Sequence, residues 1–141
     1  MIIADTGFWV ALFSPNDQYH ALAQQKLKQL NERLITTYPV LTETCHLLLK
    51  RSGQQAVIGF MNSYAQGAFQ LYHLDQIHHP KRIIQAMKKY ADLPMDLADA
   101  SLVMLADHLG HGRILTTDAR DFHTYRWKSH HPFENLLNPL N

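Results

Sequence analysis

Two aspartates stand at the ends of apolar segments, where an acid side chain could take part in chemistry. Asp5 follows the apolar run of residues 1–4, and Asp118 follows residues 113–117, which also have the pattern of a strand. Ligands of open parallel sheets bind beyond the carboxyl ends of the strands, so the two carboxylates are expected in one crevice if these strands are central neighbours. Each aspartate could equally serve only as the cap of the turn or helix that follows it.

Two further acids lie on predicted helices that are otherwise apolar. Glu43 has apolar residues three positions before it and four positions after it, which share its helical face. Glu43 is therefore either buried or at an edge of the helix that reaches water. If it is buried without a partner, its carboxylate costs several kcal/mol or takes up a proton. Asp99 interrupts the apolar pattern of residues 96–109. A simpler role for Asp99 is a capping-box arrangement with Asp96 at the start of that helix.

The four acids come from four separate segments, and together they indicate a metal site. They are Asp5, Glu43, Asp99 and Asp118. Like charges that converge in a cleft raise one another's pKa unless a cation neutralises them. An all-oxygen pocket suits Mg²⁺, with Mn²⁺ as a substitute. Such an ion can activate water for in-line attack and stabilise charge on phosphate oxygens, so hydrolysis of phosphodiester bonds is the expected chemistry.

Strands and helices alternate along the chain in an order that would position these acids. Apolar runs predict strands over residues 1–4, 34–37, 68–74 and 113–117. Apolar residues at helical spacing predict helices over residues 7–13, 17–30, 39–50, 54–64, 77–90 and 96–109. This alternation predicts an α/β fold, a three-layer sandwich with a mainly parallel central sheet. Because the sequence has no repeat or linker, we expect one domain over residues 1–141.

The overall composition narrows the class of protein. Lys and Arg number 13 against 12 Asp and Glu, a formal charge of +1, so any contact with nucleic acid must be local. The longest early apolar stretch, residues 2–13, is interrupted by Asp5 and is far short of the roughly 20 residues of a membrane span. The single cysteine, Cys45, suits a buried thiol in a reducing compartment. We therefore expect a cytoplasmic protein without a membrane partner.

The ordered set of motifs resembles the PIN-domain family over nearly the whole chain. Nucleases of that family carry an Asp after the first strand, a Glu in the helix after the second, and two later Asp positions. The matching segments here are Ile3-Ala4-Asp5-Thr6, Leu41-Thr42-Glu43, Asp99-Ala100-Ser101-Leu102-Val103 and Thr116-Thr117-Asp118-Ala119-Arg120-Asp121-Phe122. The resemblance implies a doubly wound sheet, an RNA substrate, and metal binding and catalysis by Asp5, Glu43, Asp99 and Asp118.

The resemblance also implies partners and a biological role. Many family members of this length are VapC-type toxins, which pair with an antitoxin that covers or blocks the active site and which tend to form homodimers. The chain is therefore predicted to be a Mg²⁺-dependent endoribonuclease, the toxin component of a type II toxin-antitoxin pair. The alternatives are an RNA-processing nuclease without an antitoxin, and a catalytically silent PIN-like module that binds RNA or protein. A phosphatase is disfavoured, because its second Asp would stand where this chain has Gly7.

Three residues match positions beside the acids of the family. Asp121 corresponds to a further acid of the last motif. It either acts on the site through a water molecule or is only an acid at the start of a helix or in a loop. Thr6 and Thr117 match hydroxyl positions that orient an acid or a metal-bound water, although each could satisfy a turn instead. Asp96 departs from the pattern, because it adds an acid one helical turn before Asp99. It either joins the metal site or only caps the helix.

The segment of residues 123–128 interleaves aromatic and basic side chains. Bases stack on aromatic faces while cations meet phosphates, so this segment could be a strand that contacts RNA. The favoured interpretation is an edge strand that packs Tyr125 and Trp127 inward.

Overall fold

Five parallel strands form the centre of the structure, a computed structural model that describes residues 1–137. The strand order is β3-β2-β1-β4-β7, and every neighbouring pair is parallel. The strands are β1 (Ile2–Ala4), β2 (Leu34–Thr37), β3 (Phe69–Tyr72), β4 (Arg113–Leu115) and β7 (Glu134–Asn135). The predicted parallel sheet is confirmed. The end of the predicted single domain, residues 138–141, lies outside the described residues.

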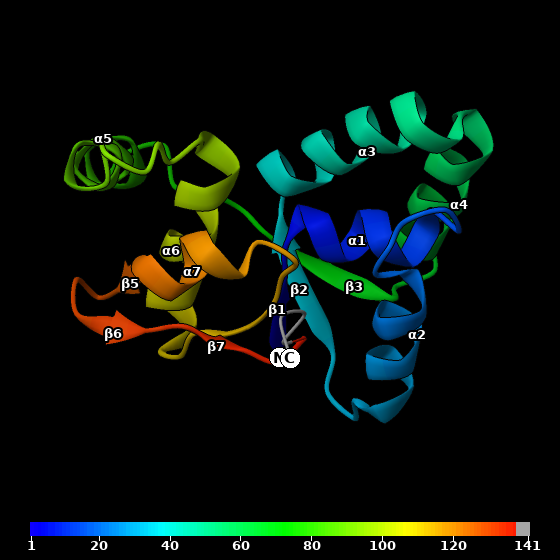
Figure 1. The fold of residues 1–141 in the computed structure, drawn as a ribbon. Helices are drawn as coiled ribbons and strands as arrows, with labels where there is room; N and C mark the ends of the chain where they lie inside the picture. Colours follow the sequence, from blue (N-terminus) through cyan, green and yellow to red (C-terminus); the bar gives the residue numbers. More distant parts are fainter. Residues whose placement is uncertain (138–141) are drawn as a thin grey trace.

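Helices cover both faces of this sheet. The chain moves outward from β1 to β3 and then returns to β4 on the other side of β1, and right-handed crossovers place these two sets of connections on opposite faces. Figure 1 shows α1–α4 on one side of the molecule and α5–α7 on the other. The helices are α1 (Thr6–Phe13), α2 (His20–Gln29), α3 (Tyr38–Ser52), α4 (Gln54–Ala65), α5 (His79–Lys89), α6 (Leu97–Leu109) and α7 (Ala119–Thr124). The three-layer α/β sandwich is thereby confirmed.

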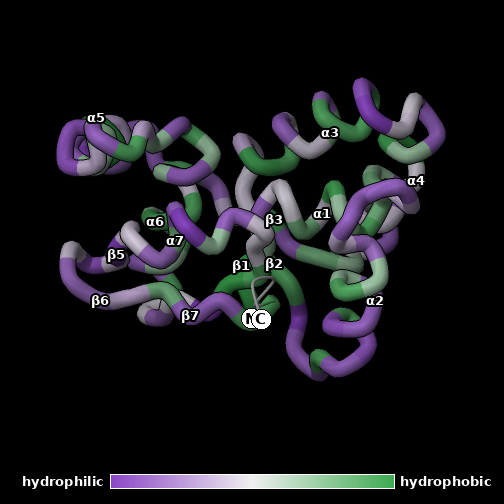
Figure 2. Tube along the Cα trace, in the orientation of Figure 1, coloured by the Kyte–Doolittle hydropathy of each residue, from purple (hydrophilic) through white to green (hydrophobic). Residues whose placement is uncertain are grey.

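The hydrophobic core lies on both faces of the central strands. All residues of β1 and β2 are buried, as expected for a parallel sheet covered on both sides. Figure 2 shows apolar residues on these strands and polar residues along much of the surrounding helices. An aromatic cluster joins three elements, with the Trp9 and Phe69 ring centroids 4.5 Å apart and those of Phe60 and Phe69 5.4 Å apart. This packing holds α1 and α4 against β3.

Some predicted boundaries are wrong by a few residues. The strand predicted over residues 113–117 ends at Leu115, because the Asn135 side chain replaces a neighbouring strand beyond that point. The Asn135 amide donates to the Thr116 carbonyl (3.1 Å), and its oxygen accepts from the Thr116 N–H (3.2 Å). Turns also shorten the elements predicted over residues 17–30, 68–74 and 77–90, which are observed as α2, β3 and α5.

The edge strand predicted over residues 123–128 is correct only in part. Its first residues complete α7, and only β5 (Arg126–Trp127) is a strand, paired antiparallel with β6 (His131–Pro132) in a separate two-stranded sheet. Tyr125 is fully buried, as predicted. Trp127 is half-buried and donates its indole N–H to the Pro132 carbonyl (3.0 Å).

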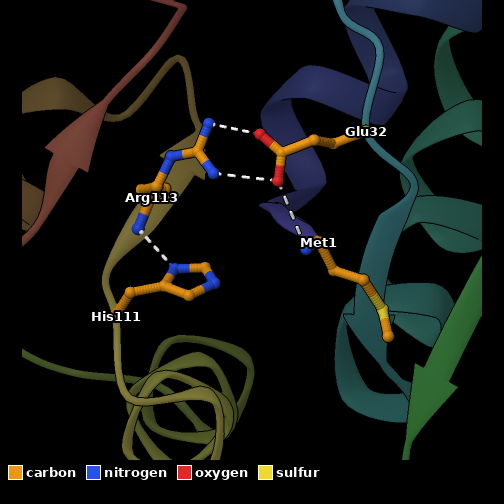
Figure 3. Close-up of polar contacts among 4 residues, drawn as sticks. All are labelled: Met1, Glu32, His111 and Arg113. Carbon is orange, nitrogen blue, oxygen red and sulfur yellow. Dashed lines mark hydrogen bonds and ion pairs between the residues drawn. The ribbon is translucent and has the colours of Figure 1, made fainter.

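The amino-terminal edge of the sheet is joined by polar contacts at the surface. Figure 3 shows the Arg113 guanidinium, at the start of β4, donating two hydrogen bonds to the Glu32 carboxylate in the loop before β2 (2.9 and 2.5 Å). The Met1 amino group lies 3.4 Å from the same carboxylate, and His111 Nδ1 accepts the Arg113 N–H (3.2 Å). Arg113 holds the pKa of Glu32 below its usual value. Because these groups are exposed, they add little to stability.

Two expectations from the composition can be compared with the structure. Within residues 1–137, no helix has both the length and the apolar character needed to cross a membrane. Cys45, on α3, is half-buried rather than fully buried as expected. Partial burial raises the pKa of its thiol.

Candidate active site

Six carboxylates line one cleft at the carboxyl ends of β1 and β4. This cleft, called the acid cleft below, has a volume of about 320 Å³. Its acids are Asp5, Glu43, Asp96, Asp99, Asp118 and Asp121. The four predicted metal ligands are therefore brought to one place, together with the two acids whose roles the sequence left open. The cleft lies where the strand order reverses, which is the usual ligand position in doubly wound folds.

Asp5 is the most deeply buried acid of the cleft, with 5% of its surface exposed. One carboxylate oxygen accepts the Thr6 N–H (2.7 Å) and thereby caps α1. The other oxygen accepts the hydroxyl of Thr116 (2.8 Å). Burial raises the pKa of Asp5 to about 7 in spite of these two hydrogen bonds, and the charges of Asp118 and Glu43 act in the same direction. Asp5 is thus both a helix cap and a cleft acid.

Thr116 is a positioning residue that the sequence reasoning missed. Its hydroxyl is fully buried, donates to Asp5 and accepts the Asp118 N–H (2.9 Å). One side chain therefore fixes the position of one cleft acid relative to the backbone of another. The available signal was its place as the first polar residue after the apolar Ile114 and Leu115. The sequence had instead suggested the neighbouring Thr117.

Asp99 lies on the first turn of α6, and Asp96 caps that helix. Asp96 accepts the Asp99 N–H (2.8 Å) and donates its own N–H to the Asp99 carboxylate (3.4 Å), so the predicted capping-box arrangement is present. The Tyr125 hydroxyl donates to the same carboxylate (3.4 Å). Burial and then the charges of Asp96 and Asp5 raise the pKa of Asp99 to about 8. The capping role and the place in the cleft coexist.

The remaining acids approach the cleft from two other helices. Glu43, on α3, lines the cleft. It is half-buried, which is intermediate between the buried position and the water-exposed edge position that the sequence allowed. Asp118 is exposed at the rim, where it caps α7 by accepting the Asp121 N–H (3.5 Å). The pKa of Asp118 is raised to about 7, first because its carboxyl group is partly shielded from water and then because of the neighbouring Asp121.

The threonines suggested by the sequence pack beside Gly7. A Cβ built at Gly7 would lie 1.9 Å from the Thr117 hydroxyl, so no larger residue fits there without displacing Thr117. A second Asp at position 7, which a phosphatase of the disfavoured type would carry, would therefore require Thr117 to move. The Thr6 hydroxyl is buried and has no hydrogen-bond partner within residues 1–137.

The acid cleft has the chemistry of a site for a hard divalent cation. Its ligating groups are all oxygens, and three of its carboxyls have raised pKa values because burial penalises their charge. A cation relieves that penalty. Among the described residues, no three His, Cys, Asp or Glu side chains are already close enough together to share one ion.

The comparisons with known proteins agree with this fold. A sequence model of the PIN domain matches residues 2–128. Ribonuclease VapC26 of Mycobacterium tuberculosis (strain ATCC 25618 / H37Rv) is 30% identical over 127 residues, which are 89% of this chain and 92% of that protein. The crystal structure of Mycobacterium tuberculosis VapC20, titled a sarcin-ricin loop cleaving toxin, matches with a TM-score of 0.77 at 20% identity, over 84% of this chain and 91% of that one. The chain belongs to the PIN-domain family.

Proposed function

We propose that this protein is a Mg²⁺-dependent endoribonuclease that hydrolyses phosphodiester bonds in RNA. The acid cleft carries the proposal, because it gathers carboxylates at the strand ends of a PIN fold where burial disfavours their charge. The names of two similar proteins support the choice of substrate. VapC26 is named a ribonuclease, and VapC20 is titled a toxin that cleaves the sarcin-ricin loop.

In this proposal Asp5, Glu43, Asp99 and Asp118 hold the Mg²⁺ ion, for which Mn²⁺ can substitute. When bound, the cation lowers the pKa of water and offsets negative charge on the scissile phosphate. Asp5, Asp99 and Asp118, whose pKa values are raised, must lose any protons they hold in order to bind it, so binding releases protons from the cleft. Two hydroxyls then keep the ligands in place, because Thr116 donates to Asp5 and Tyr125 donates to Asp99.

Three further residues have supporting roles in the proposal. Thr6 follows Asp5 in the chain, and its hydroxyl, which has no hydrogen-bond partner within residues 1–137, is proposed to hold water beside Asp5. Thr117 packs against Gly7 and shapes the wall of the cleft. Asp121 lines the cleft without belonging to the four assigned ligands and is proposed to act through water.

We assign this activity to the toxin component of a type II toxin-antitoxin pair, a cytoplasmic homodimer that a cognate antitoxin holds inactive. An RNA-processing nuclease would use the same acid cleft without an antitoxin. A silent binding module is disfavoured, because a protein that only holds a polyanion gains nothing from six carboxylates in its cleft.

The proposal is tested by cleavage of a mixed pool of tRNA and mRNA by purified protein. We expect fragments with Mg²⁺ or Mn²⁺ and none with EDTA. Cleavage that persists in EDTA would contradict the metal requirement. No cleavage under any condition, by folded protein free of antitoxin, would favour the silent binding module.

Removing the Thr116 hydroxyl is expected to weaken the site without removing a ligand. Thr116→Val keeps the shape of the side chain but deprives Asp5 of its 2.8 Å donor. We expect the Mg²⁺ concentration for half-maximal cleavage to rise by about tenfold, the lower end of the range for residues that orient metal ligands. Thr124→Val is the matched control, because the exposed Thr124 hydroxyl donates only to the Arg120 carbonyl of its own helix. Equal Mg²⁺ requirements in the two variants would remove Thr116 from the site.

A further inference from the structure

A second pocket with the opposite charge lies about two helical turns along α6 from the acid cleft, between α5, α6 and the hairpin formed by β5 and β6. We call it the basic pocket. Its volume is about 160 Å³. It is lined by the cations Arg82, Lys89, Arg126 and Lys128, and by the single carboxylate Asp107. In a chain whose formal charge is only +1, these cations are a local concentration of positive charge.

The turn that carries Lys128 into this pocket has a strained backbone. Lys128 and Ser129 have φ angles of 45° and 69°, a left-handed conformation that residues other than glycine rarely adopt. Side chains from two helices hold the turn: Asp107 accepts the Lys128 N–H, and the Lys89 ammonium donates to the Ser129 carbonyl (2.9 Å). Positive φ angles at both central residues are what a type I′ hairpin turn requires, and the His130 N–H donates to the Trp127 carbonyl across this turn (3.3 Å). The hairpin turn thus places the exposed Lys128 at the edge of the basic pocket.

A short chain of contacts connects the basic pocket to the acid cleft. The Arg126 N–H donates to the Tyr90 hydroxyl (3.0 Å), the Tyr90 ring packs edge-on against Tyr125 (5.0 Å), and the Tyr125 hydroxyl donates to Asp99 (3.4 Å). Along α6, Asp99 and Asp107 are eight residues apart, about 12 Å. A nucleic-acid strand that enters the acid cleft could therefore reach the basic pocket within a few nucleotides.

We propose that the basic pocket binds a backbone phosphate of the RNA substrate, away from the bond that is cleaved. This inference rests on the proposed function. The acid cleft repels a polyanion until a cation occupies it, so the chain needs positive groups nearby to retain the substrate. Lys128, Lys89 and Arg126 supply them, while the charge of Arg82 is offset by its ion pair with Asp107. Because the contact is with phosphate, it adds affinity without sequence preference.

The test measures RNA binding in the absence of cleavage. The probe is a fluorescent mixed-sequence oligoribonucleotide, titrated in EDTA with the Asp99→Asn protein and with Asp99→Asn proteins that also carry Lys128→Gln or Lys28→Gln. Lys28 is the matched control, because it is an exposed lysine on α2, on the other side of the molecule (Figure 1). We expect Lys128→Gln to weaken binding by about fivefold to tenfold and to reduce the slope of log Kd against log salt by about one. Lys28→Gln is expected to change Kd by less than about twofold.

A glycine variant separates binding from a structural role of Lys128. Lys128→Gly relieves the strained φ angle, so it should raise the thermal midpoint by about 2 °C or more while weakening RNA binding as much as Lys128→Gln. A loss of thermal stability without a loss of RNA affinity would overturn the proposal.

The remaining outcomes are also decisive. Equal Kd values for the Lys128→Gln and Lys28→Gln proteins, or no RNA binding by the Asp99→Asn protein at low salt, would overturn the proposal. So would tighter binding of polyglutamate than of RNA at equal charge concentration, because the pocket would then suit an acidic protein segment. Since no cleavage is measured, failure of the nuclease proposal leaves these results unaffected.

Discussion

Replacing Asp99 with Asn is expected to lower the single-turnover rate of Mg²⁺-dependent RNA cleavage by about a hundredfold to a thousandfold. Asp99 is the carboxyl on α6 whose pKa is raised to about 8 by burial and by the charges of Asp96 and Asp5. The amide keeps the size of the side chain and can still accept the Asp96 N–H, so the helix start is preserved. It brings no negative charge to the cation. The rate is measured by rapid quench at several Mg²⁺ concentrations.

The control for this variant is Asp92→Asn, the same chemical change at an exposed residue in the connection between α5 and α6. Its cleavage rate should stay within about twofold of that of the unsubstituted protein. If Asp99→Asn cleaves as fast as Asp92→Asn, the acid cleft is not the site of cleavage. Partial recovery of the Asp99→Asn rate at high Mg²⁺ would indicate that Asp99 contributes mainly to affinity for the cation.

The acids themselves could be predicted from the sequence because each interrupts a local pattern. Asp5 and Asp118 follow apolar strands, and Asp99 stands among apolar residues of one helix. The carboxyl ends of parallel strands lie at the same edge of a sheet, so an acid that follows a predicted strand can be placed at that edge from the sequence alone. The structure places all three on the acid cleft, together with Glu43.

The residues that hold the acids in place could not be found in this way. Thr116 meets Asp5 only because β4 pairs with β1, and Asn135 holds Thr116 only because β7 lies next to β4. Tyr125 was correctly predicted to be buried, but its contact with Asp99 depends on how α7 packs near the start of α6. The two-residue strands β5, β6 and β7 are too short to show an alternating pattern. Such contacts depend on tertiary packing, which the periodicity of a segment does not encode.

The unfolding free energy of the metal-free protein is expected to fall as pH rises from about 4 to about 8. The pKa values of Asp5 and Asp99 are raised from 3.8 to about 7 and about 8 in the folded chain. Between these limits the folded chain binds more protons than the unfolded chain, so raising the pH favours unfolding. Asp99 is partly accessible to water, and the acids act on one another. We therefore expect a loss of about 2 kcal/mol, well below the sum of the separate shifts.

Mg²⁺ should reverse this loss at pH 8 and have little effect at pH 5, because the cation replaces the protons that the cleft carboxyls hold at low pH. Urea unfolding at both pH values, with Mg²⁺ and with EDTA, measures the effect. The Asp99→Asn protein has one fewer carboxyl to ionise, so in EDTA at pH 8 it should be more stable than the unsubstituted protein and should gain less from Mg²⁺. An unsubstituted protein that becomes more stable as pH rises through this range, with no response to Mg²⁺, would show that the cleft carboxylates are stable without a cation. In that outcome the cleft carboxylates would neither destabilise the metal-free fold nor hold the ion.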